Sequence, residues 1–218
     1  MHICISIYTF ILQTYIMLKK LILCWLIAMP ILVNAQSYVD DITDFRDGYK
    51  MSLLTGSHAL KPADTAYVRF YDIDPDYRVK AFFVPINGAK PFPINTAHGG
   101  VRKSVRVYGY IYFNLMGAAL KLYVYRFLDM ENNPQLSDKL FIPFVDRTNY
   151  KETFGGGRYL DLSANDIKNN EVIIDFNKCY NPHTAYEKGY PYIIPPNANK
   201  LRIEIKAGEK IFGHDPGY

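Results

Sequence analysis

Hydrophobic residues follow two different spacings along the chain, and the change divides it into a helical and a β-rich part. Between Tyr38 and Leu54 they recur at every third or fourth position, which places them on one face of a helix: Val39, Ile42, Phe45, Tyr49 and Leu53. Acidic residues crowd the first turn of this predicted helix, where they favour its amino end. Thr55-Gly56-Ser57 is typical of the point at which a helix ends.

From Tyr67 onwards, apolar residues alternate with polar ones, which is the period of a β-strand. The alternating runs predict about eight strands, at residues 67–71, 78–84, 101–115, 120–128, 140–145, 158–162, 171–176 and 201–206. In the longest run, Gly109 indicates a bulge or the close approach of another backbone. Met116-Gly117-Ala118 predicts a hairpin between this run and the next.

The two faces of the longest predicted strand have different compositions. We expect its apolar residues, from Val101 and Val105 to Phe113 and Leu115, to share one face. The other face carries a row of tyrosines, at 108, 110 and 112, which either lines a pocket or packs beneath a helix or loop.

Composition supports one β-rich domain. The 218 residues are 49% hydrophobic, which is enough for one packed core and short for two. Nineteen Tyr and thirteen Phe favour strands over helices, and internal repeats are absent. The expected fold is therefore mainly β, an antiparallel β-sandwich or open barrel with one N-terminal helix.

Residues 17–35 have the three parts of a secretory signal. Lys19 and Lys20 precede an apolar run, and Ala35 stands at the expected cleavage site. Because residues 1–16 place apolar side chains ahead of the positive region, we expect translation to start at Met17. The alternative, a membrane anchor that spans both apolar stretches, is interrupted by the two lysines. We therefore interpret residues 1–35 as a signal peptide and residues 36–218 as a single exported domain, periplasmic or extracellular.

Removal of the signal changes the chemistry that the chain can offer. It would take away two of the three cysteines and leave Cys179 alone, so no internal disulfide is expected. The remaining 23 basic residues (25 − 2) against 21 acidic ones give a net charge of +2. That balance predicts neither a nucleic-acid partner nor a membrane surface, and the mature chain should have no stable membrane span.

The glycine-rich motif Gly155-Gly156-Gly157-Arg158 has two interpretations. It could cradle a phosphate, but phosphate-binding loops require a helix after the glycines, and here a strand follows. The pattern therefore favours a turn in which glycine tolerates a positive φ. The motif from Asp175 to Pro182 enters a long loop, where Asp and Asn either tie the loop to its own backbone or contact a ligand.

The polar residues of these motifs form the strongest candidate site. Arg158 could clamp a carboxylate or phosphate with its planar fork, and the other candidate ligand-binding residues are Asp161, Asn177 and Asn181. The alternative is an internal salt bridge between Arg158 and an aspartate. For catalysis, His183 is the best acid/base candidate, with Asp146 or Asp175 as orienting partner. No catalytic sequence motif and no metal-ligand spacing is present, so no metal and no cofactor is expected.

Several motifs together resemble the uncharacterised bacterial family catalogued as domain of unknown function 1684 (DUF1684), from about Phe45 to Lys210. The landmarks are Phe70-Tyr-Asp-Ile-Asp-Pro-Asp-Tyr-Arg-Val, Leu140-Phe-Ile-Pro-Phe-Val-Asp-Arg-Thr, Glu152-Thr-Phe-Gly-Gly-Gly-Arg-Tyr-Leu-Asp-Leu, Asp175-Phe-Asn with Tyr180-Asn-Pro, and Pro195-Pro with Ala207-Gly-Glu. The resemblance implies no activity. Where the family pattern has cysteines, this chain has Thr184 and Tyr192, so a thiol mechanism is not expected and Cys179 is interpreted as a packing group.

The working hypothesis is an exported domain that binds a small polar or anionic ligand through the stretch from Leu140 to Pro196. The alternatives are a hydrolase-like enzyme that uses the same polar cluster, and a structural or interaction module of the cell envelope.

The leader generates the first testable prediction. Expression of the full chain in a secreting bacterial host should yield a protein that begins at Gln36 and has lost its only tryptophan, Trp25. Intact-mass analysis and tryptophan fluorescence of the exported protein check this. Retention of Trp25, or a lipid on Cys24, would contradict it.

Overall fold

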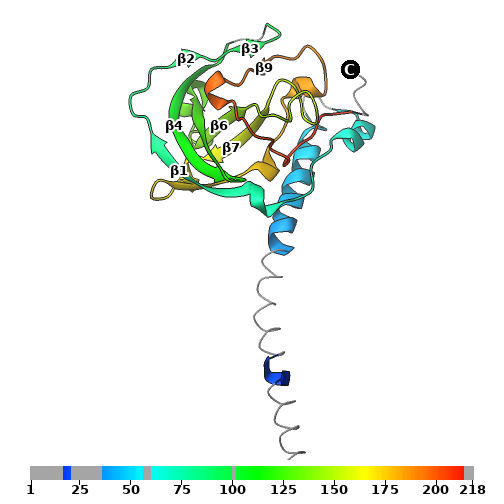
Figure 1. Ribbon diagram of the computed structural model, residues 1–218. Helices are drawn as coiled ribbons and strands as arrows, with labels where there is room; N and C mark the ends of the chain where they lie inside the picture. Colours follow the sequence, from blue (N-terminus) through cyan, green and yellow to red (C-terminus); the bar gives the residue numbers. More distant parts are fainter. Residues whose placement is uncertain (1–16, 21–35, 56–59, 100–101, 214–218) are drawn as a thin grey trace, which may run out of the picture. The chain divides into compact units, whose positions relative to one another are not determined.

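The computed structural model describes residues 17–20, 36–55, 60–99 and 102–213 (Figure 1). The predicted signal peptide, residues 1–35, lies outside the described residues except for the short helical piece 17–20. The helix predicted between Tyr38 and Leu54 is confirmed and spans residues 36–52. The chain divides into two compact units, residues 1–45 and 46–218, and the second contains all the strands described below.

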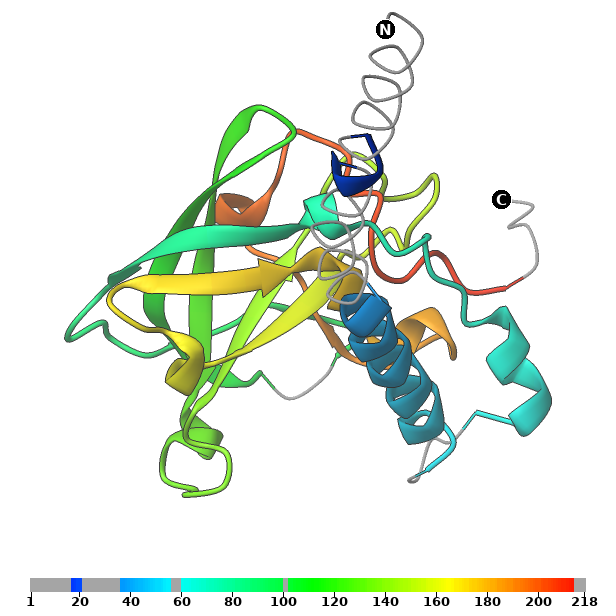
Figure 2. The same ribbon diagram turned by 90° about the horizontal axis from the view of Figure 1, so that it is seen from below.

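The second unit is built on one antiparallel sheet of seven strands, which confirms the mainly β prediction. The order across the sheet is β7-β6-β5-β4-β1-β8, with β2 beside β4. The sheet curls strongly, as Figures 1 and 2 show, so it is an open barrel rather than a sandwich of two sheets. Its strands are β1 Arg78–Pro85, β2 Phe92–Pro93, β4 Ser104–Leu115, β5 Ala118–Phe127, β6 Lys139–Phe144, β7 Arg158–Ser163 and β8 Glu171–Asp175.

Short elements connect these strands. β3 Thr96–Ala97 and β9 Tyr192–Ile193 pair with each other in a separate two-stranded sheet. One short α-helix, α2 Leu128–Glu131, follows β5. The 3₁₀ helices are Pro62–Tyr67, Pro75–Tyr77, Ala164–Asp166, Phe176–Lys178, His183–Ala185 and Asn197–Asn199.

Two of the predicted strands are wrong. At residues 67–71, a 3₁₀ helix that begins with Pro62 occupies the start, and only Phe70 forms an isolated bridge, to Glu209. Residues 201–206 form no regular strand. This segment runs beside residues 145–147 through a few backbone hydrogen bonds, such as the one from the Leu201 N–H to the Val145 carbonyl.

A bulge in β4 confirms the interpretation of Gly109 but overturns the single apolar face expected for this strand. Val107 pairs with Tyr125 and Gly109 pairs with Val124, so Tyr108 is an extra residue in the ladder. One extra residue exchanges the two faces of a strand, because side chains alternate. A Cβ on Gly109 would lie 2.5 Å from the Phe83 ring and from the Val84 carbonyl, so only glycine fits at the bulge.

The sheet consequently buries side chains on both faces. The larger cluster, on what we call the core face, includes Ile111, Phe113 and Leu115 from after the bulge. The smaller cluster lies on the opposite face and includes Val105 from before the bulge. Its other buried members are Ile94, Tyr125, Phe127, Phe141, Tyr159 and Ile193.

A buried ion pair lies within the core face. The guanidinium of Arg158, at the start of β7, donates to Asp146 over 2.8 Å, and both side chains are fully buried. Asp146 also accepts hydrogen bonds from the backbone and hydroxyl of Thr148. Arg158 donates further to the carbonyls of Ile205, Ala207 and Glu209. Arg158 therefore binds one carbonyl of the predicted strand 201–206, that of Ile205, and two carbonyls just beyond it.

Replacing Arg158 tests whether this ion pair stabilises the fold. Arg158→Ala should lower the free energy of unfolding by about 3–5 kcal/mol, because it leaves the Asp146 carboxylate buried without its partner. Arg147→Ala, at the exposed residue directly after Asp146, is the matched control and should change stability by less than about 0.5 kcal/mol. Urea unfolding measures both. Equal effects of the two substitutions would show that Arg158 does not hold the fold.

Candidate functional site

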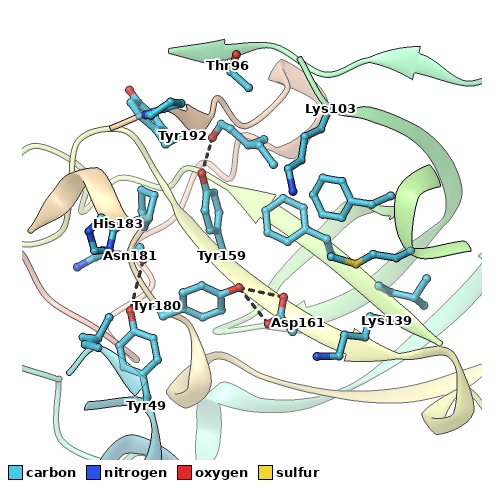
Figure 3. Close-up of a pocket in the computed structure, with 18 of the residues that line it drawn as sticks. Tyr49, Thr96, Lys103, Lys139, Tyr159, Asp161, Tyr180, Asn181, His183 and Tyr192 are labelled. Carbon is cyan, nitrogen blue, oxygen red and sulfur yellow. Dashed lines mark hydrogen bonds between the residues drawn. The ribbon is translucent and has the colours of Figure 1, made fainter. Parts of the chain in front are cut away.

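A cavity of about 490 Å³ opens on the face of the sheet opposite to the core face (Figure 3). Its volume is in the range typical of small-molecule sites. Twelve of its 19 lining residues fall between positions 140 and 196, the stretch expected to carry a site. The lining residues outside that stretch are Tyr49, Leu53, Thr96, Lys103, Phe127, Met130 and Lys139.

Aromatic rings form a large part of the cavity wall. Seven of the lining residues are aromatic: Tyr49, Phe127, Phe141, Tyr159, Tyr180, Tyr186 and Tyr192. Tyr159 is held at both ends, because its hydroxyl also donates to the Ile193 carbonyl over 2.9 Å. Its ring stands edge-on to Phe141 and Tyr180, at centroid distances of 4.8 and 5.8 Å. The wall is therefore both apolar and held in place by ring packing.

One side of the cavity carries two lysines and an aspartate. In Figure 3, Asp161 lies near Lys139, and Lys103 lies farther away on the same side of the cavity. The Tyr180 hydroxyl lies 3.0 Å from both carboxylate oxygens of Asp161. Partial removal of the Asp161 carboxylate from water raises its pKa. The hydrogen bond from Tyr180 and the positive charge of Lys139 oppose this shift. Lys103 lies 3.8 Å from Asp129 and above the Phe127 ring, and Lys139 forms no ion pair with any residue that the structure describes.

The other end is backed by a buried carboxylate, Glu209. It is fully buried and accepts hydrogen bonds from the Asn181 N–H at 2.7 Å, the Tyr186 hydroxyl at 2.7 Å and the Tyr49 hydroxyl at 3.2 Å. The two hydroxyls are also 2.5 Å apart. Burial raises the pKa of Glu209 to about 7, and the hydrogen bonds that it accepts oppose this shift. Tyr49, Asn181 and Tyr186 line the cavity, so they separate Glu209 from it.

Three of the predicted site residues lie at the cavity: Asp161, Asn181 and His183. Arg158 and Asp146 do not, because they are buried together on the core face. The ligand clamp expected of Arg158 is thus corrected to the alternative internal salt bridge. Since Asp146 is bound to Arg158 and Thr148 in the core, it is not placed to orient His183 at the cavity.

Asn177 and Asp175 lie away from the cavity and fasten the loop that follows β8. The Asn177 amide donates to the Asp74 carbonyl and to Asp175, and its oxygen accepts from the Asp74 N–H. Asp175 also accepts from the Asn177 N–H and so caps the short helix that follows. These contacts match the alternative in which Asp and Asn tie the loop to backbone, and they correct the ligand-binding role expected of Asn177.

The glycine motif is a turn. Gly157 has a φ of +96°, a conformation that favours glycine. A Cβ on Gly155 would lie 2.3 Å from the Tyr150 ring, and one on Gly156 would lie 2.4 Å from the Phe154 ring. The glycines therefore allow close packing and a left-handed turn before β7.

Sequence reasoning missed Tyr49, Tyr186 and Glu209. Tyr49 appeared only as an apolar position of a helix, and Tyr186 lay inside a loop. Glu209 stands in the landmark Ala207-Gly208-Glu209, and the φ of +73° at Gly208 carries the backbone through this point. A polar residue in a tightly turned landmark was the one signal that could have found the buried carboxylate.

In the described part of the chain, no three His, Cys, Asp or Glu side chains come close enough together to hold a metal ion. Among the same residues, no helix is both long and apolar enough to cross a membrane.

Comparisons with known proteins give a family and a fold. The sequence profile of the family described as "Protein of unknown function (DUF1684)" matches residues 64–210. A comparison with curated proteins finds no match. The chain is similar to the solution NMR structure of an uncharacterized protein from Haloarcula marismortui, with a TM-score of 0.63 and 24% identity. The alignment covers 81% of this chain and 96% of that one, and at this identity it shows the fold alone.

The environment of Glu209 predicts a specific pH dependence of stability. Between its ordinary pKa of 4.5 and its folded pKa of about 7, the folded protein holds a proton that the unfolded chain has released. Stability should therefore fall as the pH rises through this window, by an amount on the order of 3 kcal/mol from this one group. Glu209→Gln cannot titrate and should flatten that part of the curve.

Chemical denaturation at pH 5, 6, 7 and 8 measures the effect as a difference between the variant and the wild type. Glu204→Gln, at an exposed carboxylate, is the control and should keep the wild-type slope. If Glu209→Gln also keeps that slope, Glu209 is ionised throughout the window and its environment is more polar than its burial implies.

Proposed function

The chain belongs to the DUF1684 family, and we propose that its cavity binds a small organic acid with an apolar or aromatic body. The observation that carries this proposal is the combination of aromatic walls with two lysines in the lining of the cavity. Apolar walls supply affinity through removal of ligand surface from water, whereas a small number of polar groups fix orientation.

The charges at the lysine end support an acidic ligand group. Lys103 and Lys139 contribute two positive charges, and Asp161 opposes them with at most one. Because the Asp161 carboxylate accepts a hydrogen bond from Tyr180, part of its negative charge is already compensated by a lining residue. Lys139, with no ion pair among the described residues, is the better placed of the two lysines to meet a carboxylate or phosphate.

The walls support a pre-formed site. Ring packing around Tyr159 and its hydrogen bond to β9 hold the aromatic surface without a ligand. A ligand therefore does not have to order these side chains when it binds, which lowers the entropic cost of binding. Stacking against Tyr and Phe rings favours flat or aromatic ligand bodies over flexible polar ones.

We also propose that the protein acts outside the cytoplasm. Support comes from the leader, with its lysine pair, apolar run and small residue before Gln36. In that location the cavity would meet small acids from the surroundings of the cell.

Titration with a panel of small carboxylates tests the proposal. The panel pairs aromatic acids, such as 3-phenylpropionate, with the neutral alcohols of the same skeleton, such as 3-phenylpropanol. The wild type should bind at least one acid, and bind it more tightly than its alcohol. The double substitution Lys103→Met/Lys139→Met should weaken acid binding about two- to thirtyfold, because exposed charge pairs are each worth about 0.2–1 kcal/mol.

Lys90→Met, at an exposed lysine away from the cavity lining, is the control and should leave the affinity unchanged. Isothermal titration at low and moderate salt measures all three proteins, and the preference for acids should shrink as salt rises. Binding by no member of the panel, or equal binding of acids and alcohols, would refute an acid-binding function.

A further inference from the structure

We infer that the end of the cavity away from the lysines recognises a hydrogen-bond donor, so that the ligand carries a hydroxyl or N–H group opposite its acidic group. This inference rests on the proposed function and specifies its ligand class. Asn181 is the central residue: it lines the cavity, its side chain is only 2% exposed, and its Oδ1 has no hydrogen-bond partner among the described residues.

An unpaired buried carbonyl oxygen is costly, so proteins normally provide a partner for it. The opposite side of the same amide is paired, because its Nδ2 donates to the Lys210 carbonyl over 2.8 Å. That bond fixes which atom of the amide is the oxygen, since a carbonyl requires a donor. The atom that remains without a partner is thus a buried acceptor, and it belongs to a residue that lines the cavity.

The hydrogen-bond donors next to the Asn181 side chain already donate to other groups of the protein. The Asn181 N–H and the Tyr186 hydroxyl both donate to Glu209. The Tyr49 hydroxyl lies within hydrogen-bond distance of Tyr186, of Glu209 and of the Asn181 carbonyl, all of them acceptors inside the protein. What Asn181 can offer a ligand is therefore acceptor capacity, which selects a donor.

The two ends together orient the ligand. Figure 3 shows Tyr49, Asn181 and His183 on one side, Lys103 and Lys139 on the other, and Tyr159 and Tyr180 between them. An acidic group at the Asn181 end would lie next to the Asn181 Oδ1, an acceptor with no partner among the described residues, and close to Glu209 behind the lining, and both are unfavourable. The acid is therefore directed to the lysines, and the aromatic rings between the two ends suit an aromatic ligand body.

Matched ligands that differ in one hydroxyl test the inference. Three pairs of increasing length are 4-hydroxybenzoate and benzoate, 4-hydroxyphenylacetate and phenylacetate, and 3-(4-hydroxyphenyl)propionate and 3-phenylpropionate. In the wild type, at least one hydroxylated acid should bind about tenfold or more tightly than its partner, because only that acid satisfies the buried oxygen. The 4-methoxy analogue, which accepts but cannot donate, should lose this advantage.

Asn181→Ala should reduce the ratio of the two affinities within a ligand pair, hydroxylated acid over plain acid, to about one. Asn199→Ala is the matched control: Asn199 is also a fully buried asparagine, but its amide bonds to Tyr123 and Pro143, away from the cavity lining. Both substitutions should lower stability, whereas only Asn181→Ala should change the ratio of affinities within a ligand pair. If Asn181→Ala does not fold, the hydroxyl and methoxy comparisons in the wild type still decide whether the cavity recognises a hydrogen-bond donor.

The outcomes separate this inference from the function on which it rests. If the wild type binds hydroxylated and plain acids equally well, or if Asn181→Ala keeps the preference, the donor-recognising end is refuted and acid binding stands. If no acid of any pair binds, the proposed function fails together with it.

Discussion

The buried ion pair of Arg158 and Asp146 is the interaction on which the rest of the structure depends. Its guanidinium reaches three carbonyls of the C-terminal segment, so one side chain holds residues 205–209 against the core face. Since a buried charge is tolerated only with partners, this arrangement cannot relax without loss of stability. The same bonds place Glu209 behind the cavity, and thus the core ion pair determines the position of the polar end of the site.

The bulge at Tyr108 has a comparable consequence for the sheet. By exchanging the faces of β4, it directs the apolar residues after it to the core and Val105 before it to the opposite face. A sheet with one apolar face would leave its other face polar and solvated. Here the opposite face also gathers Phe127, Phe141 and Tyr159, and these side chains supply the cavity wall.

Local periodicity predicted much of this fold because it depends on side chains near in sequence. The helix at residues 36–52, the β4–β5 hairpin and the bulge at Gly109 were all visible as patterns. The segment at 201–206 was misjudged in part because its Ile205 carbonyl bonds to a distant arginine, which no local pattern records. Glu209 and its tyrosine partners were missed for the same reason, since they come from three separate parts of the chain.

The polar residues that looked functional divide by one physical criterion, whether their hydrogen-bonding capacity is already used inside the protein. Arg158 and Asn177 are bound to carbonyls and carboxylates of the fold, which accounts for their presence without a ligand. Asn181 comes from the same motif as Asn177, yet its Oδ1 remains without a partner among the described residues and it lines a cavity. Sequence alone cannot separate two asparagines four positions apart, because the difference lies in what surrounds each amide. Of the two, only Asn181 retains an interaction that a ligand would complete.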